Sequence, residues 1–512
     1  MSAALTLSPA QVTALRAALD SADYTLDSVT ALLGAEVLES LRAGSFAGAL
    51  HRFAKLPASP LKTLCALFYL GAPVTRDELQ TTFTQLTPEE LTAAGVLRAN
   101  NSYFSAAVSL NPVTIADGHN RESGAYSWWL FSDLDDHLRK EAVSDDHVMG
   151  VGGATRSLIS QLPPLKVATA ADIGTGCGVV AFHLAKRAAK VVATDLSSRT
   201  LNFAQVNAQL NEIVNIEFRA GDLFAPLGAE RFDLLASNPP FVINPAGESA
   251  LSYRSTQEPG DALVARFTKQ LPGYLNNEGR AVALLSWENY WGKNFADRPT
   301  AWLEQSVKQF GSAWVIERDR VNPLAYAKMW ARDGGVQLGT AASEKLQRSY
   351  LDDFEKREVS TVSFGSLHLQ NGGQKPVLHV AEVRSPYGDP QKLGSAIDAA
   401  FRTGSRITGL SDSEILESRL MLAAGVKEQR LHKPGEADPQ EIWFAATLPF
   451  LQQYPAGTAT AAMLGASDGE LSVGQIAGAL ADIFEVEPEA LATELCTVVR
   501  ELAYTGLFTV AP

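Results

Sequence analysis

Short apolar runs alternate with amphipathic segments through the middle of the chain, from about residue 115 to residue 390. An apolar run followed by a helical pattern is typical of a strand and the crossover helix that returns to the next parallel strand. The alternation therefore predicts an α/β fold, in which helices cover both faces of a mostly parallel sheet. The strand candidates are Ala168–Ile173, Val191–Asp195, Ile216–Ala220, Asp233–Ser237, Ala281–Ser286 and Trp314–Glu317.

Two further strands are expected at the end of this block. Val362–Leu369 and Val377–Val383 have strand character, and the turn Asn371-Gly372-Gly373 lies between them. A glycine-containing turn between two strand patterns indicates a hairpin. We expect this antiparallel hairpin to complete the sheet.

The first block, residues 1–112, is rich in helical patterns and resembles a winged helix in its order. An apolar helix, Leu61–Leu70, is followed by a helix that Thr75 caps with Glu78, and then by one that opens at Thr87-Pro88. A hairpin is expected over Val96–Leu110. The block has nine acidic and seven basic residues up to position 110, so no basic face is evident. Both nucleic-acid contact and a packing or protein-contact role stay open.

The last block, residues 393–512, is expected to be helical and acidic, with another possible winged helix over Leu471–Phe508. From Glu441 onward it has nine acidic residues and a single basic one, Arg500. Such a surface repels phosphates, which favours a protein-contact or structural module. The chain is therefore divided into three expected domains, 1–112, 113–392 and 393–512.

Charge and composition narrow the class of protein. The net charge is −14 and the pI about 5.2, which argues against tight binding to a polyanion but leaves room for a local basic patch. No apolar run is long enough for a membrane span, and the first ten residues lack the pattern of a signal peptide. The cysteines Cys65, Cys177 and Cys496 are far apart and the histidines are scattered, so we expect no metal site. A cytoplasmic protein without membrane partners is expected.

A glycine-rich loop follows the strand Ala168–Ile173 and precedes a helical pattern at Val179–Ala188. Glycines let the backbone approach a ligand closely and adopt positive φ angles. The spacing is G-x-G-x-G rather than the G-x-G-x-x-G of dinucleotide sites. S-adenosylmethionine (SAM) has no pyrophosphate and needs close backbone approach instead. The residues of this loop are Asp172, Ile173, Gly174, Thr175, Gly176, Cys177 and Gly178.

Carboxylates follow the next two strands. Asp195, with Leu196 beside it, ends the second strand, where an acid can accept hydrogen bonds from both ribose hydroxyls. Asp222 follows the third strand and is placed to accept from the exocyclic amine of an adenine, with Leu223 beside the ring. Either acid alone is more often a helix cap. The three features in order, at consecutive strand ends, predict SAM binding.

The fourth strand ends in Asn238-Pro239-Pro240-Phe241. In an open α/β sheet, ligands bind at the carboxyl ends of the strands. The two prolines restrict the backbone and hold Asn238 stiffly. Its side-chain carbonyl and the Pro239 carbonyl can both accept hydrogen bonds from one NH₂ group, which directs the nitrogen lone pair toward a methyl donor. Phe241 offers a flat apolar face for a planar substrate. These residues are the catalytic candidates for methylation of a planar nitrogen.

The glycine loop and the Asn-Pro-Pro-Phe tetrad resemble those of class I SAM-dependent methyltransferases, which have a Rossmann-like core with a mostly parallel seven-stranded sheet. The group includes HemK-like glutamine methyltransferases and ribosomal-RNA guanine and DNA or RNA adenine N-methyltransferases. Glu258-Pro259, followed by Ala262-Leu263, resembles the glutamine enzymes, whereas Phe241 is common in the RNA guanine enzymes. The resemblance covers about residues 150–290. It implies cofactor roles for Gly174, Gly176, Asp195 and Asp222, and binding of the substrate amine by Asn238. The full set of expected cofactor residues is Asp172, Gly174, Thr175, Gly176, Gly178, Asp195, Leu196, Asp222, Leu223, Asn238 and Thr155.

Three functions stay open. We favour methylation of a nucleobase amine in RNA or DNA, because of Phe241 and the N-terminal winged-helix pattern. Methylation of a glutamine-type amide in a protein is the alternative, since the total charge and the last block are acidic. A non-catalytic SAM-binding scaffold is the third. Tyr253 and Arg254 in the loop after the tetrad, and Trp287, Tyr290 and Trp291 after the fifth strand, are candidates for contact with the substrate.

Overall fold

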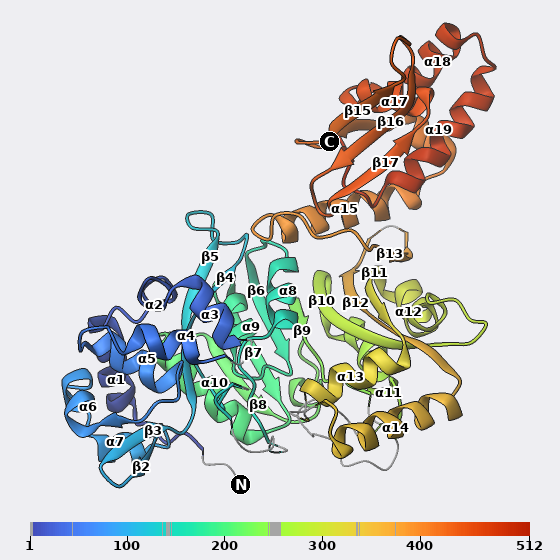
Figure 1. Ribbon diagram of the computed structural model, residues 1–512. Coiled ribbons are helices and arrows are strands. Elements are labelled where there is room, and N and C mark those ends of the chain that lie inside the picture. Colours follow the sequence, from blue (N-terminus) through green and yellow to red (C-terminus); the bar gives the residue numbers. More distant parts are fainter. Residues whose placement is uncertain are drawn as a thin grey trace.

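The structure is a computed structural model that describes residues 4–42, 45–135, 137–139, 144, 146–243, 245, 258–333, 336, 338–373 and 375–511. At its centre, within these ranges, is a sheet of eight strands in the order β13-β11-β12-β10-β9-β6-β7-β8 (Figure 1). Its strands are β6 (Val167–Ile173), β7 (Ala188–Asp195), β8 (Ile216–Ala220), β9 (Phe232–Ser237), β10 (Leu275–Tyr290), β11 (Gly311–Val321), β12 (Val359–Asn371) and β13 (Leu378–Glu382).

Helices follow the strands of the parallel part as the apolar pattern predicts, because each crossover covers one face of the sheet. The expected α/β fold with a mostly parallel sheet is confirmed: of the described strands in this sheet, only β12 runs antiparallel to its neighbours, β10 and β11. The helices of this region are α8 (Gly153–Gln161), α9 (Val179–Ala185), α10 (Ser198–Leu210), α11 (Ala262–Gln270), α12 (Asp297–Phe310), α13 (Pro323–Asp333) and α14 (Ala341–Lys356), with short 3₁₀ turns at Ala225–Leu227 and Leu271–Tyr274.

The predicted hairpin at the end of the sheet is wrong. β12 inserts between β10 and β11, and β13 pairs with the far side of β11 in parallel. The turn at Asn371-Gly372-Gly373 therefore leads across β11 rather than back along β12. A strand pattern in the sequence shows which residues form a strand but not which strand they pair with. The described part of the sheet has eight strands, whereas the resemblance implied seven.

The N-terminal block has the winged-helix order expected from its sequence. Its last three helices and three strands follow one another as helix, strand, helix, helix, strand, strand, and β3 lies between β1 and β2. The hairpin turns at Asn101, which has a φ of 54°. The elements are α1 (Pro9–Ser21), α2 (Leu26–Leu33), α3 (Ala35–Arg42), α4 (Ala47–Phe53), α5 (Pro60–Phe68), β1 (Val74–Thr75), α6 (Arg76–Thr82), α7 (Pro88–Ala93), β2 (Leu97–Asn100) and β3 (Tyr103–Ala106).

A two-stranded ribbon, β4 (Ser109–Ala116) and β5 (Ala125–Ser132), joins this block to the central sheet. Asp117 at its end accepts hydrogen bonds from Arg187 and from Nδ1 of His183, while Trp128 donates to His183 Nε2 over 3.1 Å. All of these side chains are buried. A buried charge that loses its partner is costly, so this cluster fixes the ribbon to α9. One continuous hydrophobic core runs from Leu5 through the ribbon into the sheet.

The C-terminal block is not simply helical, which corrects the expectation for residues 393–512. Its described residues form six strands, of which β15 is exposed along its whole length, so its apolar pattern is weak. The central strand β14 lies between β18 and β19, antiparallel to both, as β3 does between β1 and β2. The elements are α15 (Leu393–Thr408), α16 (Asp412–Glu417), β14 (Arg419–Leu422), β15 (Lys427–His432), β16 (Pro439–Ala446), β17 (Gln452–Ala456), α17 (Thr458–Gly465), β18 (Asp468–Ser472), α18 (Val473–Phe484), α19 (Pro488–Leu502) and β19 (Phe508–Val510).

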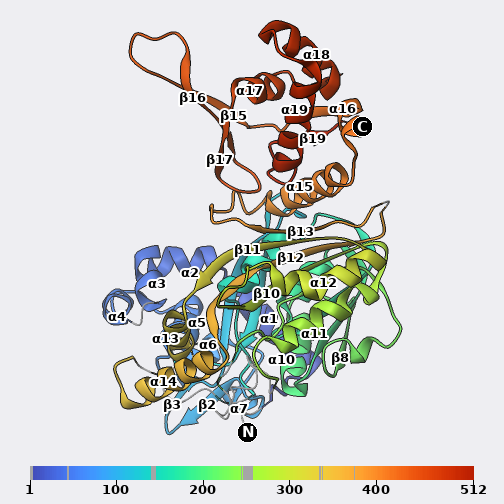
Figure 2. The same ribbon diagram turned by 90° about the vertical axis from the view of Figure 1, so that its right-hand side faces the viewer.

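This C-terminal module stands apart from the rest of the molecule and contacts the sheet at β11 and β13 (Figures 1 and 2). Trp314, at the start of β11, packs on the rings of Tyr504 and Phe450 at centroid distances of 5.1 and 6.1 Å. A side chain at Gly404 of α15 would lie 2.5 Å from the ring of Tyr504, so the helix approaches closely there. The module is thus fixed to the sheet at β11 and β13, where His379 also stacks on Tyr504 at 4.0 Å. Among the described residues, no helix is both long and apolar enough to cross a membrane.

Candidate active site

The carboxyl ends of four parallel strands lie at the same level. Ile173 at the end of β6 is level with Thr194 of β7 and with Ser237 of β9, and Asp195 is level with Ala220 of β8. The register therefore brings the glycine loop, the two acidic strand ends and the tetrad to one edge. This is the position at which open α/β sheets bind ligands.

The glycine loop is shaped by three left-handed residues. Gly174, Gly176 and Gly178 have φ angles of 75°, 57° and 95°, which only glycine adopts at little cost. The backbone N–H groups of Gly174 and Thr175 both donate to the carbonyl of Thr194 over 2.9 Å. No atom of the described residues lies within 4 Å of the place where a Cβ of Gly176 would be. The backbone is thus open to a ligand on that side.

Asp172 supports this loop from inside. Thr175 Oγ1 donates to its Oδ2 over 2.6 Å, and both side chains are buried. Burial raises the pKa of Asp172 to about 7. Its other oxygen, Oδ1, is buried without a hydrogen-bond partner among the described residues, which is unusual for a native carboxyl group.

Asp195 supports the glycine loop by a hydrogen bond to its backbone. Its Oδ2 accepts from the N–H of Gly176 over 3.1 Å and its Oδ1 from the N–H of Ser197 over 3.0 Å. Burial raises the pKa of Asp195. A carboxylate has about four acceptor positions, so each oxygen keeps one for a further donor. Leu196, beside it, is 73% exposed.

Asp222 and Leu223 lie in a tight turn after β8. Leu223 is buried and has a φ of 42°, while Asp222 is exposed. Thr194 Oγ1 donates to the carbonyl of Leu223 over 3.3 Å, which ties this turn to β7. Arg266 of α11 donates to Oδ2 of Asp222 over 2.9 Å. No sequence pattern pointed to that ion pair, because the two residues are 44 positions apart.

The tetrad is anchored on both sides of Asn238. Ser237 Oγ donates to the carbonyl of Ile173 over 2.8 Å, and Ser286 Oγ donates to the carbonyl of Phe241 over 2.9 Å. Oδ1 of Asn238 is buried and accepts no hydrogen bond from the described residues. Pro239 is buried, and the Phe241 ring meets Phe364 edge-on at 6.4 Å. An acceptor fixed in place but unpaired is suited to a donor from a ligand.

Asn207 of α10 is a supporting residue that sequence reasoning missed. Its side-chain NH₂ donates to the carbonyls of Cys177 in the glycine loop and Phe131 in β5, over 3.0 and 2.9 Å. A buried asparagine within the apolar run Phe203–Ala208 was the available signal, because a buried polar side chain needs partners.

Other candidates are not brought into this group. Thr155 lies half-buried in the first turn of α8 and makes no hydrogen bond to the glycine loop within the described ranges. Trp287 is a core residue whose Nε1 donates to the carbonyl of Phe295. Tyr290 donates to Glu288, and Trp291 is 76% exposed at the end of β10. Tyr253 and Arg254 lie outside the described residues.

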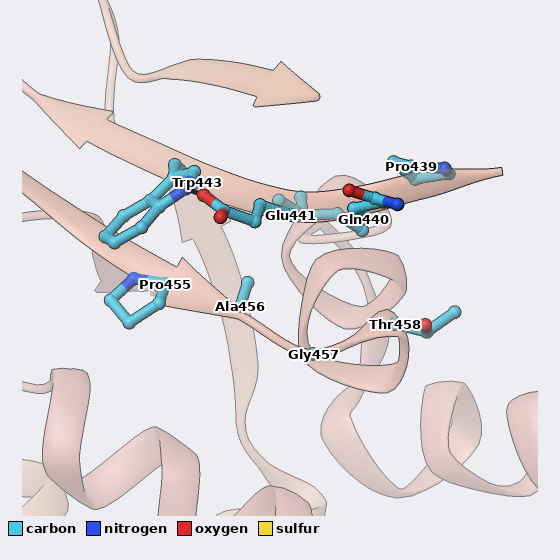
Figure 3. A pocket seen from close by; sticks show the side chains of 9 residues that line it. Pro439, Gln440, Glu441, Trp443, Pro455, Ala456, Gly457 and Thr458 are labelled. Carbon is cyan, nitrogen blue, oxygen red and sulfur yellow. Dashed lines mark hydrogen bonds between the residues drawn. The ribbon is translucent and has the colours of Figure 1, made fainter. Parts of the chain in front are cut away.

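A separate cavity of about 370 Å³ lies on the C-terminal module, between β16, β17 and the start of α17 (Figure 3). Its acidic residue, Glu441, already accepts a hydrogen bond from Nε1 of Trp443 over 2.9 Å. Much of the wall of this cavity consists of proline and glycine residues and of apolar side chains from β16 and β17. It lacks the paired polar groups of a reaction site, and no group of three or more potential metal ligands occurs among the described residues.

The part of the chain that carries the carboxyl edge is similar in sequence to known proteins. Residues 148–267 match the family described as Methyltransferase small domain, and residues 21–107 match a Domain of unknown function (DUF7059). A release factor glutamine methyltransferase of Xylella fastidiosa is 43% identical over 130 residues, which are 23% of this chain and 46% of that protein. A ribosomal protein uL3 glutamine methyltransferase of Bordetella pertussis is 31% identical over 172 residues, 31% of this chain and 57% of that protein.

A Methanocaldococcus jannaschii protein named as a putative N5-glutamine methyltransferase is 32% identical over 134 residues, 25% of this chain and 67% of that protein. The chain belongs to the HemK-like class I SAM-dependent methyltransferases. It spans about half the length of the first two relatives. The expected family and its cofactor, SAM, are confirmed. The relatives' names favour the glutamine alternative over the nucleobase amine that we preferred from the sequence.

Proposed function

We propose that this chain transfers the methyl group of SAM to the side-chain amide nitrogen of a glutamine in a protein. The observation that carries this proposal is Oδ1 of Asn238, a buried acceptor without a partner among the described residues, at the edge that also bears the glycine loop. A primary amide offers two N–H donors, and one of them would complete this acceptor.

The cofactor has a consistent place in this proposal. Gly174, Gly176 and Gly178 let the backbone approach its amino-acid end, with Asp172 and Thr175 supporting the loop from below. Asp195 accepts hydrogen bonds from the ribose hydroxyls beside Leu196, since each carboxylate oxygen keeps an acceptor position. Asp222 accepts from the adenine amine, with Leu223 beside the ring. When bound, SAM supplies an electrophilic methyl group.

The protein's contribution to the reaction is mainly orientation. An amide lone pair is delocalised, so the nitrogen is a poor nucleophile. Asn238 Oδ1 and the Pro239 carbonyl would accept hydrogen bonds from the two N–H groups, which turns the lone pair toward the methyl group. As the N–C bond forms, the bond from the methyl group to the sulfur would break and S-adenosylhomocysteine would leave, while the nitrogen would release one proton to water. Orientation of bound reactants is worth up to roughly 7–11 kcal/mol in favourable cases. Phe241, held by Ser286 and Phe364, packs on the flat face of the amide.

A polypeptide substrate suits the charge of the molecule better than a nucleic acid does. The net charge is −14, and the N-terminal winged helix has no basic excess. Phosphate contacts depend on clusters of lysine and arginine. The domain division at residues 112 and 392 is part of this proposal: the central domain catalyses, and the N-terminal and C-terminal domains flank it.

The test is transfer of a labelled methyl group from SAM into a lysate from a strain lacking the protein. Portions of the product are then digested separately with RNase, DNase and protease. The proposal expects the label to be released by protease alone, and Asn238→Ala to transfer none. Release by a nuclease would show instead that the acceptor is a nucleobase.

A further inference from the structure

Arg266 joins two carboxylates that belong to different parts of the site. From α11 its Nη1 donates to Oδ2 of Asp222 over 2.9 Å, while its Nε and Nη2 donate to Oε1 of Glu258 over 3.1 and 2.7 Å. Asp222 stands after β8, and Glu258 is followed directly by the segment that leads into α11. One guanidinium therefore bridges the turn after β8 and the chain that returns from the tetrad.

Stability alone does not account for this bridge. The side chains of Arg266, Asp222 and Glu258 are 34%, 51% and 34% exposed, and ion pairs at such positions contribute little to folding because water screens them. The backbone of Asp222 is already fixed on both sides: Gly221 donates to the Asp195 carbonyl over 3.0 Å, and Leu223 is buried. The fixed backbone still allows the carboxylate of Asp222 to rotate. Arg266 removes that freedom by binding Oδ2.

We propose that Arg266 is a positioning residue for the cofactor: by occupying Oδ2 of Asp222 it directs Oδ1 toward the exocyclic amine of the adenine. The inference rests on the adenine role given to Asp222 above. An arginine is charged throughout the neutral range, and the bonds to Glu258 and Asp222 raise the pKa of Arg266 further. Glu258 holds the other side of the guanidinium, which limits its rotation as well.

The test measures recognition of the amine directly, without turnover. Dissociation constants of S-adenosylhomocysteine and S-inosylhomocysteine, which carries a carbonyl in place of the amine, are determined by calorimetry for the full chain. The wild type is expected to prefer the adenosyl compound by at least about tenfold, the worth of one hydrogen bond to a charged acceptor. Arg266→Ala is expected to reduce that preference to below about threefold, and Arg266→Lys to leave an intermediate value.

Arg219 provides a matched control. It also bridges two carboxylates, donating to Glu217 over 2.7 Å and to Glu230 over 2.5 Å, but neither is a candidate cofactor residue. Arg219→Ala should keep the wild-type preference. A merely structural effect would weaken both compounds equally and leave their ratio unchanged. If Arg266→Ala does not fold, Arg266→Lys is judged by the same ratio.

The outcomes separate the inference from its premise. If Asp222→Ala loses the preference and the Arg266 variants keep it, Arg266 is not a positioning residue, although the adenine role of Asp222 stands. If the wild type binds both compounds equally, Asp222 does not read the amine and the inference falls with that assignment. Loss of the preference in Asp222→Ala and Arg266→Ala, but not in Arg219→Ala, supports it.

Discussion

Two regions of the central sheet lie at a similar level but are finished differently. Where the C-terminal module covers β11, Trp314 is 1% exposed and packs against rings of that module, including Tyr504. At the carboxyl ends of β6 and β9, Asn238 and Asp172 each keep a buried oxygen without a partner among the described residues, and Gly176 faces open space. Trp314 Nε1 is also buried without a partner among these residues, but packed rings close that region, whereas the carboxyl edge leaves its acceptors beside an open backbone.

This difference indicates which residues contribute mainly to stability and which contribute mainly to the reaction. Within the described residues, only the carboxyl edge brings together glycines with positive φ, strand-end acids and a stiff Asn-Pro-Pro segment. Substitutions in the region under the C-terminal module and at the carboxyl edge should therefore change different quantities. The following predictions test that separation in order of expected effect.

Trp314→Ala should have the largest effect, on stability. Removing a buried tryptophan from a packed ring cluster is expected to lower the free energy of unfolding by about 3–5 kcal/mol, measured by urea denaturation followed by circular dichroism. The SAM affinity of the folded variant should stay within about twofold of the wild type. A large loss of SAM affinity without loss of stability would remove the distinction between the two regions.

Asn238→Ala should have the opposite effect. Losing an oriented acceptor in an active site typically lowers kcat about 100-fold or more, and here the free energy of unfolding should not fall, because the oxygen removed is unpaired among the described residues. Turnover is followed with labelled SAM and the protein acceptor from the lysate. A variant as active as the wild type would take Asn238 out of the reaction.

Asp195→Ala is expected to weaken SAM binding at least about tenfold, since it loses hydrogen bonds to two hydroxyls worth roughly 1–3 kcal/mol. The readout is isothermal calorimetry with SAM. Asp233→Ala is the matched control: Asp233 accepts from the backbone of Thr169 over 2.9 Å at the opposite end of β6. The control should lose stability and bind SAM normally, whereas equal losses of affinity would contradict the assignment.

Asp172→Asn should change how stability depends on pH. Burial raises the pKa of Asp172 from 3.8 to about 7, so the folded state holds this proton in a range where the unfolded state has released it. The contribution of the Asp172 proton to the free energy of unfolding is therefore full below about pH 4, and it declines as the pH rises to about 7. An amide side chain cannot titrate in this range, so the variant should lack this decline in chemical denaturation curves at about pH 4–8. If the free energy of unfolding changes with pH in the same way for the wild type and the variant, the raised pKa of Asp172 is contradicted.

The alternation of strands and helices was sufficient to predict the parallel half of the sheet and the level of the site. Glycine spacing and strand ends are local signals, and a parallel register places them at one edge. The position of β12 and β13 was wrong because pairing is decided by long-range packing rather than by the turn at Gly372-Gly373. β15 was missed because its residues are exposed and so carry no apolar periodicity.

The contacts that organise the site were less accessible to sequence reasoning. Asp195 was assigned to the ribose, yet it also holds the N–H of Gly176. The bridge from Arg266 to Asp222 and the support of Cys177 by Asn207 join residues 44 and 30 positions apart. Such contacts depend on the three-dimensional arrangement, for which a single sequence offers no local pattern.

The most direct test of the central claim is to identify the methylated atom. Protein labelled by the wild-type chain and radioactive SAM is purified and hydrolysed in acid, which converts N5-methylglutamine to glutamate and methylammonium. The hydrolysate is then made alkaline, which frees volatile methylamine. The account predicts that the label distils as methylamine, and that none appears with Asn238→Ala. Label that stays non-volatile on a methylated lysine, arginine or base would contradict methyl transfer to a glutamine amide.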